Sequence, residues 1–145
     1  MRIIALDFGH RRIGVATTDP TGTIVRGVST IDRKVHPQYT LELQKIFDEL
    51  QPEKVIFGLP LGPDDEETEM CVSVRNFQKR IYEKLSLTLP FDFQDESFSS
   101  VRTQSLMRKT STKKKRAQKG NIDRIAACII LEDYIRESSG SPLLY

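Results

Sequence analysis

The chain has 145 residues, a length that fits one compact domain. With 38% hydrophobic and 29% charged residues it has the composition of a soluble globular protein, and no apolar run approaches the roughly 20 residues that span a bilayer. The net charge of +2 hides an asymmetry, because residues 108–119 hold seven of the 22 basic residues and no acidic residue. A mildly acidic body with one basic segment is typical of a protein that attracts phosphates to one place.

The first half of the chain predicts three strands and a helix. Two short apolar runs within residues 3–19 are separated by Gly9, which permits a tight reversal, and they predict a hairpin with Asp7 near the end of its first strand. Residues 23–30 predict a third strand, and apolar side chains at helical spacing predict a helix over 38–50. A carboxylate at the end of a strand is poorly placed for a core and well placed for a site at the sheet edge.

The second half predicts alternating strands and helices. The expected elements are a strand at 54–60, a helix at 66–85, a strand at 90–95, a short helix at 98–108 and a last helix at 121–137. An antiparallel meander followed by crossover helices predicts an α/β protein with the ribonuclease H-like fold, a mixed five-stranded sheet flanked by helices. We expect residues 1–138 to form this one domain and residues 139–145 to form a flexible tail.

Three carboxylates occupy comparable places in this order of elements. Asp7 ends the first strand, Glu96 follows the fifth, and Asp123 lies in the first turn of the expected last helix. Carboxylates at the ends of parallel strands, without histidine or cysteine, suit Mg²⁺ or Mn²⁺, and such clusters hydrolyse phosphodiesters with two ions about 3.5–4 Å apart. We therefore expect Asp7, Glu96 and Asp123 to be the catalytic residues and the metal ligands.

Each carboxylate also has a simpler interpretation. Asp7 suits a cap on the turn at Gly9, and Asp123 suits the positive end of a helix dipole. Asp95 competes with Glu96, because neighbouring residues of a strand point to opposite faces and only one of the two is expected to face the site. We favour Glu96.

Four segments, in this order along the chain, resemble motifs of the YqgF family of Holliday-junction-resolvase-like proteins, regarded as pre-16S rRNA nucleases. The segments are ALDFGHRRIGVATTD (5–19), VIFGLPL (55–61), DES (95–97) and NIDRIAACIILEDYI (121–135). The resemblance spans nearly the whole chain. It implies a ribonuclease H-like fold, a metal-dependent nuclease and a role in maturing the 5′ end of 16S rRNA. Ser97 departs from the pattern, since the family usually has an arginine there, and an arginine can hold a phosphate through two hydrogen bonds.

Basic residues near the expected site predict a nucleic-acid partner. The candidate phosphate-binding residues are Arg11, Arg12, Lys113, Lys114, Lys115 and Arg116. The expected partner is RNA, as pre-16S rRNA in a pre-ribosomal particle, or else branched DNA. We expect no membrane partner, and a monomer or weak dimer. Cys71 and Cys128 lack metal-ligand spacing, and with no signal peptide they favour a reduced cytoplasmic protein.

Three other functions are compatible with parts of this pattern. A Holliday-junction resolvase cuts symmetric junctions as a dimer, so a monomer would favour RNA processing. A catalytically impaired RNA-binding module of the same fold is suggested by Ser97, and cleavage that depends on divalent ions would separate it from an enzyme. The first hairpin also resembles that of actin-like ATPases, but 145 residues leave no room for the second domain they need.

Overall fold

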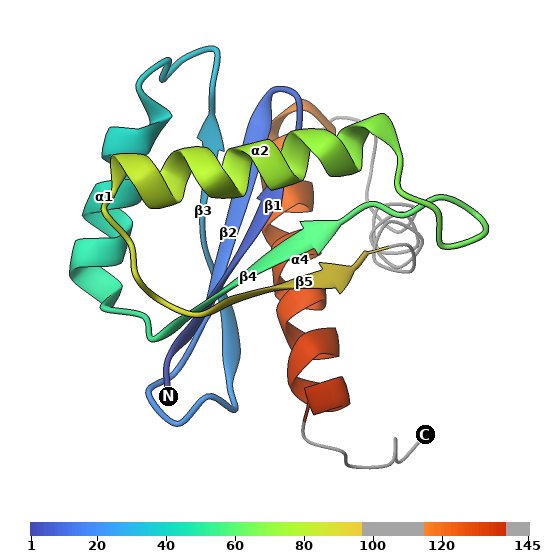
Figure 1. Cartoon of the computed structure of the whole chain (residues 1–145). Helices are drawn as coiled ribbons and strands as arrows, with labels where there is room; N and C mark the ends of the chain where they lie inside the picture. The colour runs from blue at the N-terminus through green and yellow to red at the C-terminus, as the bar shows by residue number, and fades with distance from the viewer. Residues whose placement is uncertain (97–114, 139–145) are drawn as a thin grey trace.

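A single mixed sheet organises the chain in the computed structural model, which describes residues 1–96 and 115–138. Its strands lie in the order β3-β2-β1-β4-β5 (Figure 1). The strands are β1 (Ile3–Phe8), β2 (Arg12–Thr18), β3 (Val25–Asp32), β4 (Lys54–Leu59) and β5 (Phe91–Asp95). The helices are α1 (Tyr39–Leu50), α2 (Glu69–Lys84) and α4 (Lys115–Ser138).

The pairing of the strands follows the expected meander and crossovers. β1 and β3 both pair antiparallel with β2, whereas β4 pairs parallel with β1 and β5. The β1–β2 turn is closed by the Gly9 N–H, which donates to the Arg12 carbonyl at 2.8 Å. The carboxyl ends of β1, β4 and β5 therefore lie at the same edge of the sheet.

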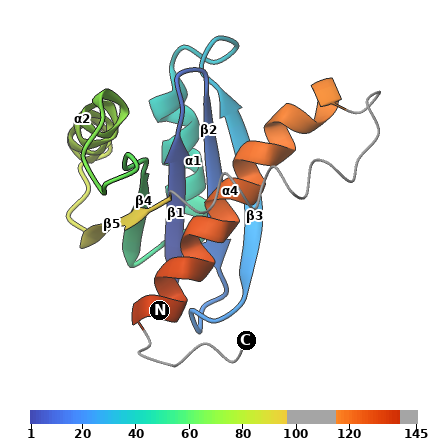
Figure 2. The same ribbon diagram turned by 90° about the vertical axis from the view of Figure 1, so that its right-hand side faces the viewer.

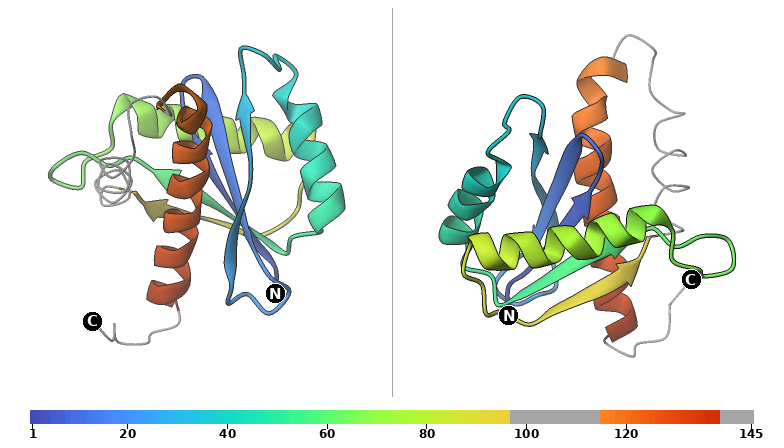
Figure 3. Two further views of the ribbon diagram at one scale, coloured as in Figure 1. Left: turned by 180° about the vertical axis from the view of Figure 1, so that it is seen from behind. Right: turned by 45° about the horizontal axis from the view of Figure 1, so that its top comes forward.

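Helices cover both faces of the sheet. α1 and α2 lie on one face and α4 crosses the other (Figures 2 and 3). Side chains of β1 alternate between the two layers: Ile4, Leu6 and Phe8 belong to the core under α1 and α2, and Ile3 and Ala5 to the core under α4. This alternation places Asp7 on the α4 face, at the end of the strand.

The expected fold class is confirmed, but three boundaries differ. β3 spans Val25–Asp32 rather than 23–30. α2 begins at Glu69 rather than 66, after a loop in which Asp65 has a positive φ of 56° that an α-helix cannot contain.

The beginning of the last helix was predicted wrongly. α4 begins at Lys115, six residues before the expected start at 121, because residues 115–119 are good helix formers and Gly120 is tolerated inside the helix. Asp123 therefore lies well inside α4, and the N-terminal dipole does not explain its presence. The expected helix over 98–108 and the tail 139–145 lie outside the described residues. In the part that the structure describes, no helix is both long and apolar enough to cross a membrane.

Candidate active site

Asp7 and Glu96 meet at the carboxyl edge of the sheet. The Glu96 N–H donates to the Leu59 carbonyl at 3.2 Å, which holds Glu96 beside the end of β4. A Cβ atom added to Gly58 of β4 would lie 2.9 Å from Glu96 Oε2 and 2.5 Å from Ile130 Cδ1. The missing side chain of Gly58 thus leaves the space through which Glu96 approaches β1.

The two carboxyl groups share a proton. Glu96 donates a hydrogen bond to Asp7. Burial and the nearby charge of Asp7 raise the pKa of Glu96 to about 9, and burial raises the pKa of Asp7 above its usual value. At neutral pH the pair therefore carries about one negative charge, as expected for two carboxylates in one partly buried site.

Asp123 reaches this edge from the opposite layer. α4 packs so closely on β2 that a Cβ atom added to Gly14 would overlap the backbone carbonyl of Asp123. Burial, followed by the charge of Asp7, raises the pKa of Asp123 to about 6, and the charge of Arg12 opposes that rise. Asp123 Oδ2 is buried and accepts no hydrogen bond from the described part of the chain.

The structure thus brings two of the three expected carboxylates into contact and places the third within electrostatic range. Glu96, rather than Asp95, contacts Asp7. Within residues 1–96 and 115–138, no three side chains of His, Cys, Asp or Glu are already grouped so that they hold a metal ion. The donor set is nonetheless all carboxylate, which suits a hard divalent cation, and the buried unpaired oxygen of Asp123 is a free ligand atom.

Comparison with known proteins identifies the family. The sequence model of the RuvX family, described as Holliday junction resolvase, matches residues 1–137. The chain belongs to the RuvX family. This is the YqgF family that the four motifs resemble, so the expected relationship is confirmed.

Relatives of similar length share about a third of the sequence of this RuvX family member. A protein of Crocosphaera subtropica named "Putative pre-16S rRNA nuclease" is 35% identical over 138 residues, 95% of this chain and 94% of its own. A protein of the same name from Chromobacterium violaceum is 36% identical over 134 residues, 92% of this chain and 96% of its own.

Solved structures confirm the fold at much lower identity. The Fowlpox virus resolvase, crystallised with Holliday junction DNA, has a TM-score of 0.56 and 16% identity and covers 97% of this chain and 100% of its own. RuvC of T. thermophilus with a Holliday junction substrate has a TM-score of 0.54 and 12% identity, with 99% of both chains covered. At such identities the likeness establishes the ribonuclease H-like architecture alone.

The expected phosphate-binding residues are placed unevenly in this RuvX family member. Arg12 lies close enough to Asp123 to lower its pKa. Arg11 forms an exposed ion pair with Asp32, with Nε 3.1 Å from Oδ2. Lys115 and Arg116 begin α4, although their side chains are outside the described part. Lys113 and Lys114, and also Ser97, lie outside the described residues.

The sequence reasoning missed two residues that shape the site. Ala126 and Ala127 were expected to let the last helix approach the sheet, and both are buried, at 8% and 0% exposure. The closest approach, however, occurs at Gly14, and Gly58 makes room for Glu96. A glycine inside a strand is the signal that identifies such positions, because it marks close approach of another part of the chain.

Proposed function

We propose that this chain is a metal-dependent nuclease that hydrolyses phosphodiester bonds during maturation of the 5′ end of pre-16S rRNA. The observation that carries the proposal is the carboxylate pair Asp7–Glu96, with Asp123 facing it, at the edge of a ribonuclease H-like sheet. The names of the full-length relatives supply the substrate.

Asp7, Glu96 and Asp123 are the residues that would hold Mg²⁺ or Mn²⁺. Their carboxylate oxygens are hard donors, and the charge of Asp7 disfavours ionisation of the other two, a repulsion that a cation relieves. When bound, the metal supplies an activated water and stabilises the leaving oxygen.

The chain's own groups prepare the site for this chemistry. Asp7 accepts the proton of Glu96, so Glu96 must release that proton before both of its oxygens can serve as ligands. Arg12 partly offsets the negative charge near Asp123. The protein contributes one fixed carboxylate pair, one buried carboxylate oxygen and a balancing cation around the place where a phosphate would lie.

The decisive experiment is incubation of the purified chain with 5′-extended 16S precursor RNA and, separately, with a four-way DNA junction. Each is tested with Mg²⁺ or Mn²⁺ and with EDTA. The proposal predicts cleavage of the RNA near the 5′ end of 16S, and only with the divalent ion. Symmetric cutting of the junction without cutting of the RNA would instead support a resolvase, the activity in the family description. Binding of RNA without any cleavage would support an RNA-binding module.

The basic segment is expected to set RNA affinity and not the chemistry. Changing Lys113, Lys114, Lys115 and Arg116 to Gln should weaken binding of unrelated RNAs alike, because such contacts are made to phosphates. The salt dependence should flatten by up to about 0.7 log units per lost single-strand contact, and turnover at saturating RNA should stay within about threefold.

A matched variant controls for the loss of four positive charges. It changes four exposed basic residues elsewhere, Arg26, Lys45, Lys79 and Lys84, to Gln. It should keep nearly all of the wild-type affinity. Normal binding by the variant of the basic segment, combined with lost turnover, would assign that segment to the active site instead.

A further inference from the structure

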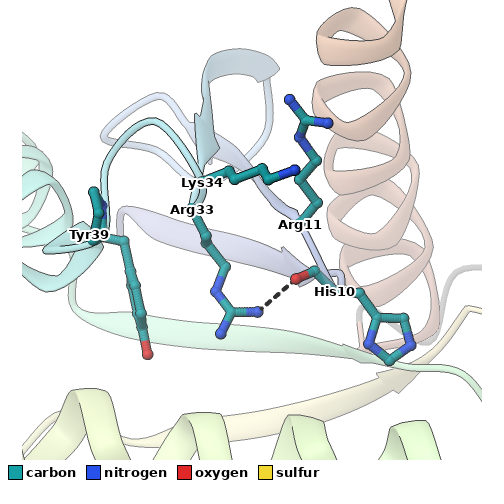
Figure 4. A pocket seen from close by; sticks show the side chains of 6 residues that line it. His10, Arg11, Arg33, Lys34 and Tyr39 are labelled. Carbon is teal, nitrogen blue, oxygen red and sulfur yellow. Dashed lines mark hydrogen bonds between the residues drawn. The ribbon is translucent and has the colours of Figure 1, made fainter.

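A basic pocket lies beside the β1–β2 turn and is separate from the carboxylates. Its volume is about 530 Å³ (Figure 4). It is lined by His10, Arg11, Arg33, Lys34, Pro37 and Tyr39, which include four basic or titratable nitrogen side chains and no acid. An adjoining hollow of about 350 Å³ shares His10 and Arg33 and continues along α2 to Ser73, Asn76 and Arg80.

Arg33 builds the wall of the basic pocket. Its Nη1 donates to the carbonyls of Gly9 and His10 at 3.2 and 3.0 Å, the second of which is drawn in Figure 4. Its guanidinium carbon lies 4.7 Å from the centre of the Phe8 ring and 5.2 Å from that of Tyr39. These contacts tie the turn after Asp7 to the segment between β3 and α1, so the pocket is preformed.

Other cations at the pocket are available for a ligand. His10, Lys34 and Arg80 are exposed. The side chains of His10 and Lys34 make no hydrogen bond to the described part of the chain. Arg80 donates one, from Nη1 to the Tyr39 hydroxyl at 3.1 Å, and retains its other donors. Arg11 is already paired with Asp32, so it contributes less.

The aromatic rings at the pocket leave no platform for a base. Phe8 lies between Arg33 and Phe77, with the two phenyl rings 4.3 Å apart. Tyr39 is 7% exposed. Because bases bind by stacking on free aromatic faces and phosphates bind to cations, this lining favours a phosphate.

The pocket is close to the carboxylates along the chain. His10 follows Asp7 by three residues, which span at most about 11 Å. Successive phosphates of one nucleic-acid strand are about 3.4 Å apart along a duplex axis, so this reach corresponds to a few nucleotides. The turn separates the two places, with Phe8 facing α2 and Asp7 facing α4.

We propose that the basic pocket binds a backbone phosphate of the nucleic-acid substrate, a few nucleotides from the bond to be cut and without regard to base sequence. The inference rests on the proposed nuclease function for its geometry. The substrate strand would pass from the carboxylates over the β1–β2 turn to Lys34 and Arg80.

The test compares two charge-matched double variants. Lys34→Gln/Arg80→Gln removes two cations from the pocket, and Lys79→Gln/Lys84→Gln removes two exposed lysines of α2 that do not line it. Binding of two labelled single-stranded RNAs of unrelated sequence is measured by anisotropy over a salt series in EDTA, where metal-dependent cleavage cannot occur. Thermal unfolding checks that both variants are folded, and Lys34→Gln alone serves as a milder second variant.

The pocket variant should bind both RNAs more weakly and lower the magnitude of the salt slope by about 1.4, or about 0.7 per lost contact, whereas the control variant should match wild type. Equal losses in the two double variants, unchanged binding in the pocket variant, or a loss confined to one RNA would overturn the inference. Since these measurements involve no cleavage, a wild-type protein that binds RNA but never cuts it would refute the nuclease and leave the pocket to be judged by its slope.

Discussion

Asp7→Asn is expected to abolish cleavage while leaving the fold intact. Asparagine keeps the shape of the side chain and removes the charge with which Asp7 would bind a cation. Metal ions contribute several kcal/mol to such reactions, and each 1.4 kcal/mol or so is a factor of ten in rate, so turnover should fall by about a thousandfold or more. Single-turnover cleavage of the precursor RNA measures this loss.

The same variant should be more stable than wild type in metal-free buffer. The folded-state pKa of Glu96 is raised from 4.5 to about 9, so its contribution to stability is complete below pH 4.5 and is lost as the pH rises to about 9. Without the charge of Asp7, the pKa of Glu96 falls and less stability is lost. The gain should be about 1–3 kcal/mol in the upper part of this range and should vanish towards pH 4.5, since one pKa unit is about 1.4 kcal/mol.

Chemical denaturation of both proteins across this pH range measures the gain. Asp64→Asn is the matched control, because Asp64 is exposed in the loop before α2 and should change neither turnover nor stability. Wild-type turnover in Asp7→Asn would rule out Asp7 as an essential ligand. A stability difference that does not depend on pH would show that Asp7 and Glu96 do not share a proton.

Gly14→Ala is expected to damage both stability and activity. The added methyl group would overlap the backbone of Asp123, which cannot move aside as a flexible side chain does. α4 must then shift away from β2, at a cost of about 1–3 kcal/mol in the free energy of unfolding. Because Asp123 moves with the helix, and a displacement of about 1 Å is enough to cost about 100-fold in rate, cleavage should fall by a similar factor.

Gly62→Ala provides the comparison for this variant. A Cβ atom there would meet the side chain of Glu66, an exposed and flexible residue, at 2.8 Å, so its effect should be small. Denaturation midpoints and single-turnover rates of the two variants measure the difference. Equal stability and activity of Gly14→Ala and wild type would show that α4 does not need to approach β2 so closely.

The sequence by itself determined most of the architecture. The alternation in β1, the reversal at Gly9 and the later strand–helix alternation are local properties, because side-chain period and turn geometry depend on residues adjacent in the chain. They were enough to predict the mixed five-stranded sheet and the edge to which Asp7 and Glu96 belong. The four motifs, being ordered along one chain, were likewise enough to identify the family.

Only the tertiary structure decided which groups meet. The contact of Glu96 with Asp7 depends on the space above Gly58, and the position of Asp123 depends on the close packing of α4 at Gly14. The wall built by Arg33 joins residues more than twenty positions apart in the chain. Such contacts depend on the distance and angle at which layers pack, which arise from side-chain volumes on both partners and have no signature in the period of either segment.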